Sequence, residues 1–427
     1  MSRLSLTLMS LTLALTPTAQ ALASSSVNVV HYGAICDGMT DDSAAIEAAA
    51  AAVPFGGRLI FPYRATCALL SHVELRGLDN VVIQGEGATL RALPEMTPGT
   101  ALMKLYSSTN VEMVDLHFDG NALLREDFSG EDRDLISGTG SNLMFYGADG
   151  LSLYGVTSID AWHDSIYFDF DYSSRDPYVM SDVFVSDLYA EGAGRNNLTI
   201  INCTHCVFTD STLADAATAN FDIEPYLSTH SVTDVLLQDS VLHGAGASCL
   251  QVSQGEAIAV SDVEIKGNIF DLCNADARGM PGVAISLDKG EDITIEDNRF
   301  ARIDLQAGFV TASDGETCEP ATFTDPDDEC VPTHSRSVID FADTARAVVR
   351  GNIFEGIIYD DPKKSSIFYF KNTANQITHS VQGNEVSGVD DDGWCWVSDA
   401  ASSSEQALVD LLVTNNILNG YVQSGCN

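Results

Sequence analysis

Basic residues are scarce in this sequence of 427 residues. Lysine and arginine together number 21 against 61 aspartates and glutamates, which gives a formal net charge of −40. Nucleic acids and anionic membranes attract proteins through positive surface, so this deficit excludes both as expected partners. It also opposes a polyanionic substrate unless bound cations, salt or a local basic patch offset the repulsion.

Long apolar runs are absent after residue 23, where no stretch reaches the roughly eighteen apolar residues of a membrane helix. An apolar run at Leu4–Leu15 follows Arg3 and precedes small residues up to Ala23, which is the pattern of a secretory signal. We therefore expect residues 1–23 to be a signal peptide cleaved near Ala23. Residues 24–427 are expected to form one secreted or periplasmic domain, active as a monomer.

The ten cysteines are an even number, which fits an oxidising compartment. Nearness in sequence suggests four pairs, although sequence leaves the connectivity open: Cys36 with Cys67, Cys249 with Cys273, Cys318 with Cys330, and Cys395 with Cys426. Cys203 and Cys206 have CxxC spacing, as in redox or zinc sites. No second CxxC exists, so we favour a small buried pair or a disulfide.

A helical period is also missing from most of the chain. The exception is the alanine-rich segment 43–52, which Thr40 or Asp41 can cap and which Pro54 ends. Between the later apolar segments no 3.6-residue period occurs, which excludes helical repeats. The sequence therefore predicts one short helix near the N-terminus and strands elsewhere.

Short apolar segments recur from about residue 80 to about residue 420. Five turns carry an asparagine at the same place: Asn268, Asn298, Asn352, Asn384 and Asn416. We expect these to adopt the left-handed conformation, which asparagine tolerates better than most residues. A second short strand occurs in each repeat, at 165–168, 197–200, 220–223, 249–252, 283–287, 337–341 and 366–370. The pattern predicts an all-β solenoid of parallel strands, a β-helix. The long intervals 121–141 and 313–333 are expected to be loops beside a binding groove.

Three N-terminal segments, 29–34, 37–46 and 56–62, resemble the N-terminal cap of the pectate-lyase-like superfamily. The resemblance implies a right-handed parallel β-helix with a short capping helix, the cap covering about residues 27–62. The superfamily includes polysaccharide lyases, uronan epimerases, glycoside hydrolases and phage tailspikes, so the resemblance implies a polysaccharide partner without fixing the chemistry.

A narrower resemblance covers the segment Phe221-Asp222-Ile223-Glu224 and the strand that follows at 235–243. It is similar to the active-site rung of bacterial mannuronan C5-epimerases, and Asp222 falls on the motif aspartate of that family. The segment departs from the motif at two places. Ala219 stands where the family has tyrosine, and Glu224 stands where it has histidine.

Stacking the second strands by their inward residues predicts which side chains share the outer wall. One outward column contains Tyr167, Thr199, Asp222 and Gln251, and a second contains Ser165, Asn197, Asn220 and Cys249. Neighbouring strands lie about 4.8 Å apart, so residues of adjacent coils can contact one sugar. The predicted catalytic residues are Asp222, Glu224, Arg195, Asp164, His163 and Tyr167. The predicted substrate-binding residues are Asn197, Asn220 and Gln251.

We expect this patch to modify a uronate-containing polysaccharide by abstraction of the C5 proton, in a lyase or an epimerase, and two alternatives follow it. In a lyase or epimerase acting on a uronate, Arg195 would neutralise the carboxylate, and His163 or Tyr167 would act as base or acid. Asp222 and Glu224 would orient them or bind Ca²⁺, the one cofactor that we expect. In an inverting glycoside hydrolase, Asp222 and Glu224 would be the two catalytic carboxylates. A non-catalytic glycan-binding solenoid is the second alternative.

Overall fold

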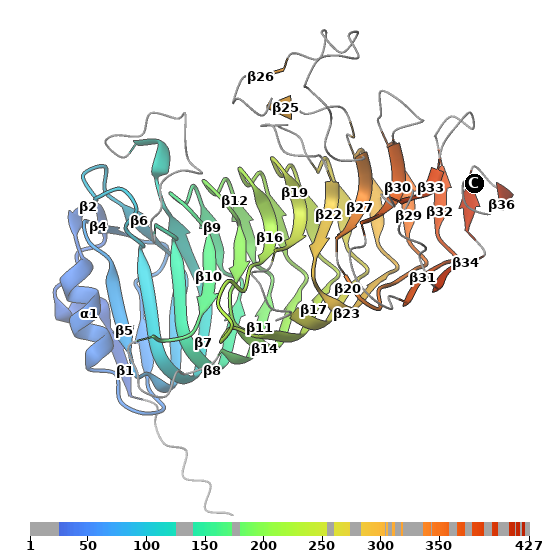
Figure 1. Cartoon of the computed structure of the whole chain (residues 1–427). Coiled ribbons are helices and arrows are strands. Elements are labelled where there is room, and N and C mark those ends of the chain that lie inside the picture. The colour runs from blue at the N-terminus through green and yellow to red at the C-terminus, as the bar shows by residue number, and fades with distance from the viewer. Residues whose placement is uncertain are drawn as a thin grey trace, which may run out of the picture.

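The computed structural model describes residues 25–124, 140–172, 180–253, 260–273 and 283–303, with shorter segments between 305 and 422. Among these residues all strands except two join one hydrogen-bonded sheet, and all pairings within that sheet but the last are parallel. The sheet winds into a solenoid whose coils follow one another from the N-terminal to the C-terminal end (Figure 1). The predicted all-β class is confirmed. No helix in the described part of the chain is long and apolar enough to cross a membrane.

Each coil contributes strands to three faces. The first face contains β1 (Ser26–Asn28), β3 (Arg58–Ile60), β6 (Asp79–Ala92), β7 (Met103–Asp119), β8 (Leu143–Tyr154), β11 (Ser181–Ser186), β14 (Cys203–Thr209), β17 (Val232–Gln238), β20 (Val260–Lys266), β23 (Glu291–Glu296), β28 (Val348–Arg350), β31 (Thr378–Gln382) and β34 (Asp410–Thr414). The second face contains β2 (Asp37–Asp41), β4 (Thr66–Leu69), β9 (Thr157–Ile159), β12 (Tyr189–Glu191), β15 (Thr212–Ala214), β18 (Val241–His243), β21 (Ile269–Asp271), β24 (Arg299–Ala301), β29 (Ile353–Glu355), β32 (Glu385–Ser387) and β35 (Ile417–Leu418), with β36 (Tyr421–Val422) antiparallel to the last.

The third face contains β5 (Val73–Arg76), β10 (Ile166–Asp169), β13 (Leu198–Ile200), β16 (Ala219–Ile223), β19 (Ser248–Val252), β22 (Val283–Asp288), β27 (Arg336–Ala342), β30 (Ser365–Lys371) and β33 (Cys395–Asp399). The long strands β6, β7 and β8 turn corners and take part in more than one face. Outside the sheet, β25 (Val310–Thr311) pairs antiparallel with β26 (Thr317–Cys318). Two short 3-10 helices, η1 (Val29–Tyr32) and η2 (Ala122–Leu124), complete the described elements.

The helix expected at 43–52 occupies Ser43–Ala51, labelled α1, and lies at the N-terminal end of the solenoid (Figure 1). It buries Ile46 and Ala49 in the core. Its N-cap position is Asp42 rather than Thr40 or Asp41. The Asp42 carboxylate makes no cap hydrogen bond, because it accepts instead from the backbone N–H groups of Ile35 and Cys36.

The predicted stacking of the third face is correct to the residue. Ile166 pairs with Leu198, Leu198 with Phe221, and Phe221 with Leu250, and all four side chains lie in the core. Each such side chain contributes about 1.5–3 kcal/mol when fully buried. Because the side-chain period of a strand is two, this register also fixes which residues of these coils point outward.

The five turn asparagines occupy equivalent positions, but the expected left-handed conformation is wrong. The residue before each one takes that conformation where it is described, for example Gly267 with φ of 66° and Asp297 with φ of 55°. The asparagines are buried instead. Asn298 accepts from the Asn268 backbone N–H at 2.9 Å and donates to the Ile265 carbonyl at 2.8 Å. They therefore form an internal ladder of amide hydrogen bonds between coils.

Three disulfides join described cysteines: Cys36–Cys67, Cys203–Cys206 and Cys249–Cys273. The first and third are predicted pairs, and the second is the favoured interpretation of the CxxC spacing. The pairs Cys318–Cys330 and Cys395–Cys426 each include a cysteine outside the described residues. The signal segment 1–23 and most of 121–141 and 313–333 also lie outside them.

Candidate active site

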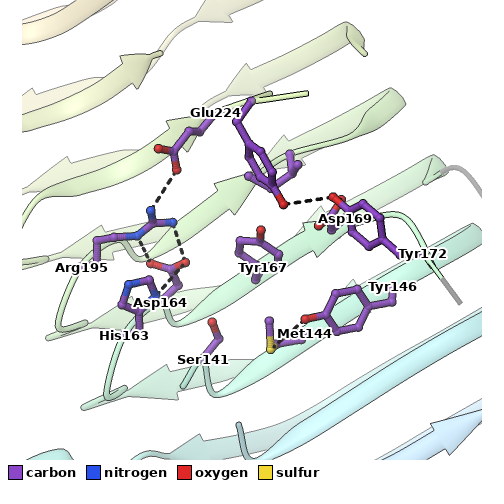
Figure 2. A pocket seen from close by; sticks show the side chains of 12 residues that line it. Ser141, Met144, Tyr146, His163, Asp164, Tyr167, Asp169, Tyr172, Arg195 and Glu224 are labelled. Carbon is purple, nitrogen blue, oxygen red and sulfur yellow. Dashed lines mark hydrogen bonds and ion pairs between the residues drawn. The ribbon is translucent and has the colours of Figure 1, made fainter. Parts of the chain in front are cut away.

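The third face carries a cavity of about 390 Å³ over β8, β10, β13 and the end of β16 (Figure 2). Its lining residues are Ser141, Met144, Tyr146, His163, Asp164, Tyr167, Asp169, Tyr172, Arg195, Ile201, Glu224 and Tyr226. Five of the six predicted catalytic residues are among them. The structure thus brings together His163, Asp164, Tyr167, Arg195 and Glu224 as the stacking predicted.

An ion-paired cluster forms one wall of the cavity. Arg195 donates from Nε and Nη2 to the two oxygens of Asp164, each at 2.9 Å, and from Nη1 to Glu224 Oε2 at 2.9 Å. Burial alone would raise the pKa of Asp164, but Arg195 and His163 overcome it and hold that pKa well below its ordinary value. The same carboxylates raise the pKa of Arg195 despite its burial. The guanidinium charge is therefore already compensated by protein groups.

His163 lies beside this cluster. Its Nδ1 is 3.5 Å from Asp164 Oδ2, and 14% of its side chain is exposed. The ring reaches the cavity from the turn before β10, next to Asp164 (Figure 2). A histidine in this position can accept or donate a proton at the cavity wall.

Asp222 lies behind the cavity rather than in it. Its side chain is fully buried, and Oδ2 accepts from Asn196 Nδ2 at 2.6 Å. Burial, and then the Glu224 carboxylate, raise the pKa of Asp222 well above its ordinary value, which Arg195 and Gln251 only partly oppose. The surroundings of Asp222 therefore favour its protonated form. Asp222 and Glu224, which were predicted to share one open face, therefore lie in different environments. Asp222 is buried away from solvent, whereas Glu224 is exposed to the cavity.

The prediction that Asn197 and Asn220 face outward is wrong. Both side chains are fully buried. Asn197 Nδ2 donates to the Ala214 carbonyl at 2.7 Å and to Asn220 Oδ1 at 2.8 Å, and Asn220 Nδ2 donates to the His243 carbonyl at 2.8 Å. Asn197 directly precedes β13 and Asn220 lies within β16, and both amides satisfy backbone carbonyls, so a sugar cannot reach them. Gln251 is half-buried and pairs with Asp222 in the next coil, outside the cavity lining.

Asp169 is a cavity residue that the stacking did not predict. It follows Phe168 at the end of β10 and is in register with Tyr146 of β8. Burial raises the pKa of Asp169 to about 6, although hydrogen bonds from the Phe170 N–H and from the Tyr172 and Tyr167 hydroxyls oppose the shift. The expected strand ended at Phe168, one residue short. Extending the outward alternation from Tyr167 by two residues would have identified Asp169.

Tyrosines surround this carboxyl group. Tyr146 stacks on Tyr106 of the preceding coil, with ring centroids 4.9 Å apart, and is tilted against Tyr167 at 6.5 Å. Tyr172 lies on the far side of Asp169 (Figure 2). Burial raises the pKa of the Tyr146, Tyr167 and Tyr172 hydroxyls above the ordinary value, so all three stay protonated. The wall opposite the ion-paired cluster thus consists of tyrosine rings whose hydroxyl groups border the cavity.

Solved structures with this architecture are similar along nearly the whole chain. The A-module of a mannuronan C-5 epimerase from Azotobacter vinelandii has a TM-score of 0.55 and 14% identity, over 92% of this chain and 99% of that one. An endo-xylogalacturonan hydrolase from Aspergillus tubingensis has a TM-score of 0.54 and 16% identity, over 91% and 98%. A tailspike protein of E. coli bacteriophage HK620, in complex with a pentasaccharide, has a TM-score of 0.58 and 14% identity, over 92% and 67%. No protein-family profile and no curated protein sequence matches this chain.

The chain is a right-handed parallel β-helix. This confirms the fold that the N-terminal segments and the repeats predicted. The β-helix shares its architecture with proteins of different activity, so its own chemistry rests on the residues of the cavity.

The cavity of the β-helix does not fit the expected Ca²⁺. Calcium takes six to eight oxygen ligands, but the Arg195 guanidinium lies between Asp164 and Glu224 and Asn196 donates to Asp222. Among the described residues, only Cys36, Asp42 and Cys67 bring three candidate ligand atoms together, and these cysteines form a disulfide. No step is therefore assigned to a metal.

Proposed function

We propose that this β-helix hydrolyses a glycosidic bond of a polysaccharide in the tyrosine-edged cavity. Asp169 acts as the general acid and Glu224 as the second carboxylate. The observation that carries the proposal is the contrast between the two groups. Burial raises the pKa of Asp169 to about 6, so it carries a proton in mildly acidic solution and in a minor fraction at neutral pH, while Glu224 is a carboxylate paired with Arg195. Two carboxyl groups in such different environments are what acid–base hydrolysis of a glycoside requires.

The register of the coils supports an inverting course. Asp169 and Glu224 directly follow Phe168 and Ile223, which are in register through Ile200 of the coil between them. Two coil spacings of about 4.8 Å put the two backbones roughly 10 Å apart. The carboxyl groups of inverting enzymes lie about 6.5–9.5 Å apart, against about 5–5.5 Å in retaining enzymes. The wider spacing leaves room for a water molecule between Glu224 and the sugar.

In this mechanism Asp169 gives its proton to the oxygen of the leaving sugar as the glycosidic bond breaks. Glu224, with 32% of its side chain exposed, removes a proton from the attacking water on the opposite face of the ring. Arg195 and Asp164 hold the Glu224 carboxylate in place. The tyrosine hydroxyls around Asp169 offer hydrogen bonds to sugar hydroxyl groups. The anomeric configuration of the product is inverted.

A second candidate is abstraction of the C5 proton of a uronate, as in a lyase or an epimerase. The convergence of the Tyr167 and Tyr172 hydroxyls on Asp169 favours it, since such groups can return or accept a proton. The compensated charge of Arg195 opposes it, because Arg195 is the only arginine or lysine among the described residues that line the cavity, and Asp164 and Glu224 already neutralise it. The net charge of −40 also suits a neutral glycan better.

A substrate panel separates the candidates. New reducing ends without ultraviolet absorbance indicate a hydrolase, unsaturated absorbing products indicate a lyase, and a changed epimer ratio by NMR indicates an epimerase. Asp169→Asn and Glu224→Gln should each lower kcat by about 10²–10⁴-fold. Binding without turnover by the unmodified protein would favour a glycan-binding solenoid. Full hydrolytic activity in Asp169→Asn would exclude the proposed mechanism.

We also propose that the protein is exported. The N-terminal segment 1–23 has the composition of a secretory signal, and the three disulfides suit an oxidising compartment. Fractionation of the native host, with N-terminal sequencing of the mature protein, tests both export and cleavage near Ala23.

A further inference from the structure

A chain of hydrogen bonds connects the backbone segment that follows β16 to Asp169, the proposed general acid. The backbone N–H groups of Tyr226 and Leu227 each lie 3.2 Å from His230 Nδ1. His230 Nε2 lies 2.9 Å from the Tyr172 hydroxyl, and that hydroxyl donates to Asp169 Oδ1 at 3.3 Å. His230 and Asp169 are therefore linked through a single tyrosine, outside the wall formed by Arg195.

The backbone fixes the tautomer of His230. An amide N–H can only donate, so Nδ1 must accept from both Tyr226 and Leu227 and carries no proton. Burial lowers the pKa of His230 to about 4, so the ring is neutral in ordinary buffers and its one proton lies on Nε2. Phe170 and Tyr226 pack edge-on against the ring, with centroids 5.1 and 4.6 Å away, and keep it in this orientation.

The tautomer in turn fixes the direction of the Tyr172 proton. Nε2–H donates to the Tyr172 oxygen, so the hydroxyl proton must be donated elsewhere. Two acceptors lie within reach, Asp169 Oδ1 at 3.3 Å and the Tyr226 hydroxyl at 3.0 Å. A carboxyl oxygen is the stronger acceptor. The Phe170 N–H also donates to Asp169 Oδ1, at 2.8 Å. Oδ1 therefore accepts two hydrogen bonds, and the proton of the acid form is left to Oδ2.

We propose that His230 and Tyr172 are positioning residues that hold the acid proton of Asp169 on Oδ2, because Oδ1 accepts from the Tyr172 hydroxyl and from the Phe170 N–H. The proposal rests on the assignment of Asp169 as the general acid. The same two residues also favour the ionised form of Asp169, since a donor to a carboxylate stabilises its charge. They thus set both the place of the transferable proton and the pH range in which it is present.

Neutral groups face Asp169 in the described part of the chain. They are the hydroxyls of Tyr146 on β8, of Tyr167 on β10, and of Tyr172 and Tyr226 in the segments after β10 and β16. Arg195, Asp164 and Glu224 form the other wall (Figure 2). A shift in the titration of Asp169 on removal of a donor is therefore attributable to that donor.

The test is a carbon-13 NMR titration of the Asp169 carboxyl group in the full chain, with no substrate present. Tyr172→Phe removes the donor and should raise the Asp169 pKa by about one unit. His230→Phe should raise it in the same direction, because the freed hydroxyl can turn to Tyr226. The double variant should show no more than the Tyr172→Phe shift, since His230 acts only through Tyr172. Tyr226→Phe removes the competing acceptor and should produce no rise.

A purely structural role of the cluster would give different results. If Tyr172→Phe leaves the Asp169 titration unchanged, or if the two single shifts add, the proposal is wrong. His230→Gln, whose amide can donate to Tyr172, should restore part of the shift. If the variants do not fold, nitrogen-15 NMR of His230 in the unmodified protein decides, because a proton on Nδ1 overturns the tautomer.

The two proposals fail separately. If the Asp169 pKa rises in Tyr172→Phe as expected but no polysaccharide is hydrolysed, the hydrogen-bonded positioning role stands and the proposed function is wrong. If hydrolysis depends on Asp169 but its titration is unchanged in Tyr172→Phe, the proposed function stands and the positioning role of His230 and Tyr172 is wrong. Where hydrolysis is found, the alkaline limb of the kcat/KM profile should move upward in Tyr172→Phe by the shift that NMR measures.

Discussion

Arg195 binds Asp164 through two parallel hydrogen bonds, from Nε and Nη2, with the carboxylate fully buried. Breaking a buried pair by removing one partner leaves an uncompensated charge, at about 3–5 kcal/mol. Arg195→Ala should therefore lower the free energy of unfolding by about that amount, as well as releasing Glu224. Urea denaturation measures it. Arg346→Ala, which breaks exposed pairs with Glu291 and Asp292, is the matched control and should cost far less. Equal losses in the two variants would show that the Arg195 cluster is not buried as described.

The ionised form of Asp169 should lower the free energy of unfolding at neutral pH. Its pKa rises from an unfolded value of about 3.8 to about 6 on folding, so the native state binds more protons between these values. Stability therefore falls as the pH rises from about 4 to 6 and stays lower above that, by about 3 kcal/mol at most. Asp169→Asn should be more stable than the unmodified protein at pH 7.5 and nearly equal to it at pH 4. Thermal unfolding at the two pH values measures the difference, and a destabilised variant at pH 7.5 would contradict the assignment.

Asp164 should behave in the opposite sense. Its pKa in the folded protein is held below the ordinary value, so the associated stability is fully present above about pH 4 and is lost as the pH falls through the folded pKa. Asp164→Asn should abolish this part of the acid destabilisation and lower stability at neutral pH, where Arg195 loses its partner. Urea denaturation from pH 2.5 to 7 tests it. A steeper acid loss in Asp164→Asn than in the unmodified protein would be inconsistent with the ion pair.

Asp222 should tolerate amide substitution. Because burial raises the pKa of Asp222 and its Oδ2 accepts from Asn196, Asn in its place preserves the shape and the contact without a buried charge. Asp222→Asn should change the free energy of unfolding by less than about 1 kcal/mol and leave hydrolysis largely intact. The matched comparison is Glu224→Gln, which should abolish most activity. If Asp222→Asn is inactive while folded, the aspartate that matches the epimerase motif has a catalytic role after all.

The asparagine ladder should carry much of the cohesion between coils. Asn298→Ala leaves the Ile265 carbonyl and the Asn268 N–H without partners, and each unsatisfied group costs about 1–3 kcal/mol. The free energy of unfolding should fall by about 2–6 kcal/mol. Asn110→Gly, at an exposed left-handed turn, is the control and should have little effect. A loss in Asn110→Gly as large as in Asn298→Ala would contradict the ladder.

The fold and most of the site wall were predictable because a solenoid repeats local rules. Apolar residues alternate along each third-face strand, and aligning their inward positions, Ile166, Leu198, Phe221 and Leu250, fixed the register of four coils. That register also predicted that Arg195, Asp164 and Glu224 lie together. Cysteines close in sequence gave correct pairs for the same reason, since neighbouring coils lie side by side.

The sequence did not reveal where several polar side chains point and what they contact. Alternation along the third-face strands predicted that Asn197 and Asn220 point outward, but both side chains are buried and donate to the backbone carbonyls of Ala214 and His243. Alternation also says nothing of what covers an outward residue, and Asn196 covers Asp222. Tyr172 and His230 meet across irregular segments 58 residues apart in sequence, which no periodicity encodes.

The alignment of Asp169 with Glu224 through Ile200 means that the distance between the two carboxylates is counted in whole coils. A change of side-chain conformation can alter that distance by part of a strand spacing, but only the insertion or deletion of a coil changes it by a whole spacing of about 4.8 Å. Deleting the coil that contains β13 would bring the carboxylates to about one strand spacing, close to the separation found in retaining glycosidases. In a scaffold of this kind, the stereochemical outcome of a reaction can change through the number of repeats, with both carboxylates retained.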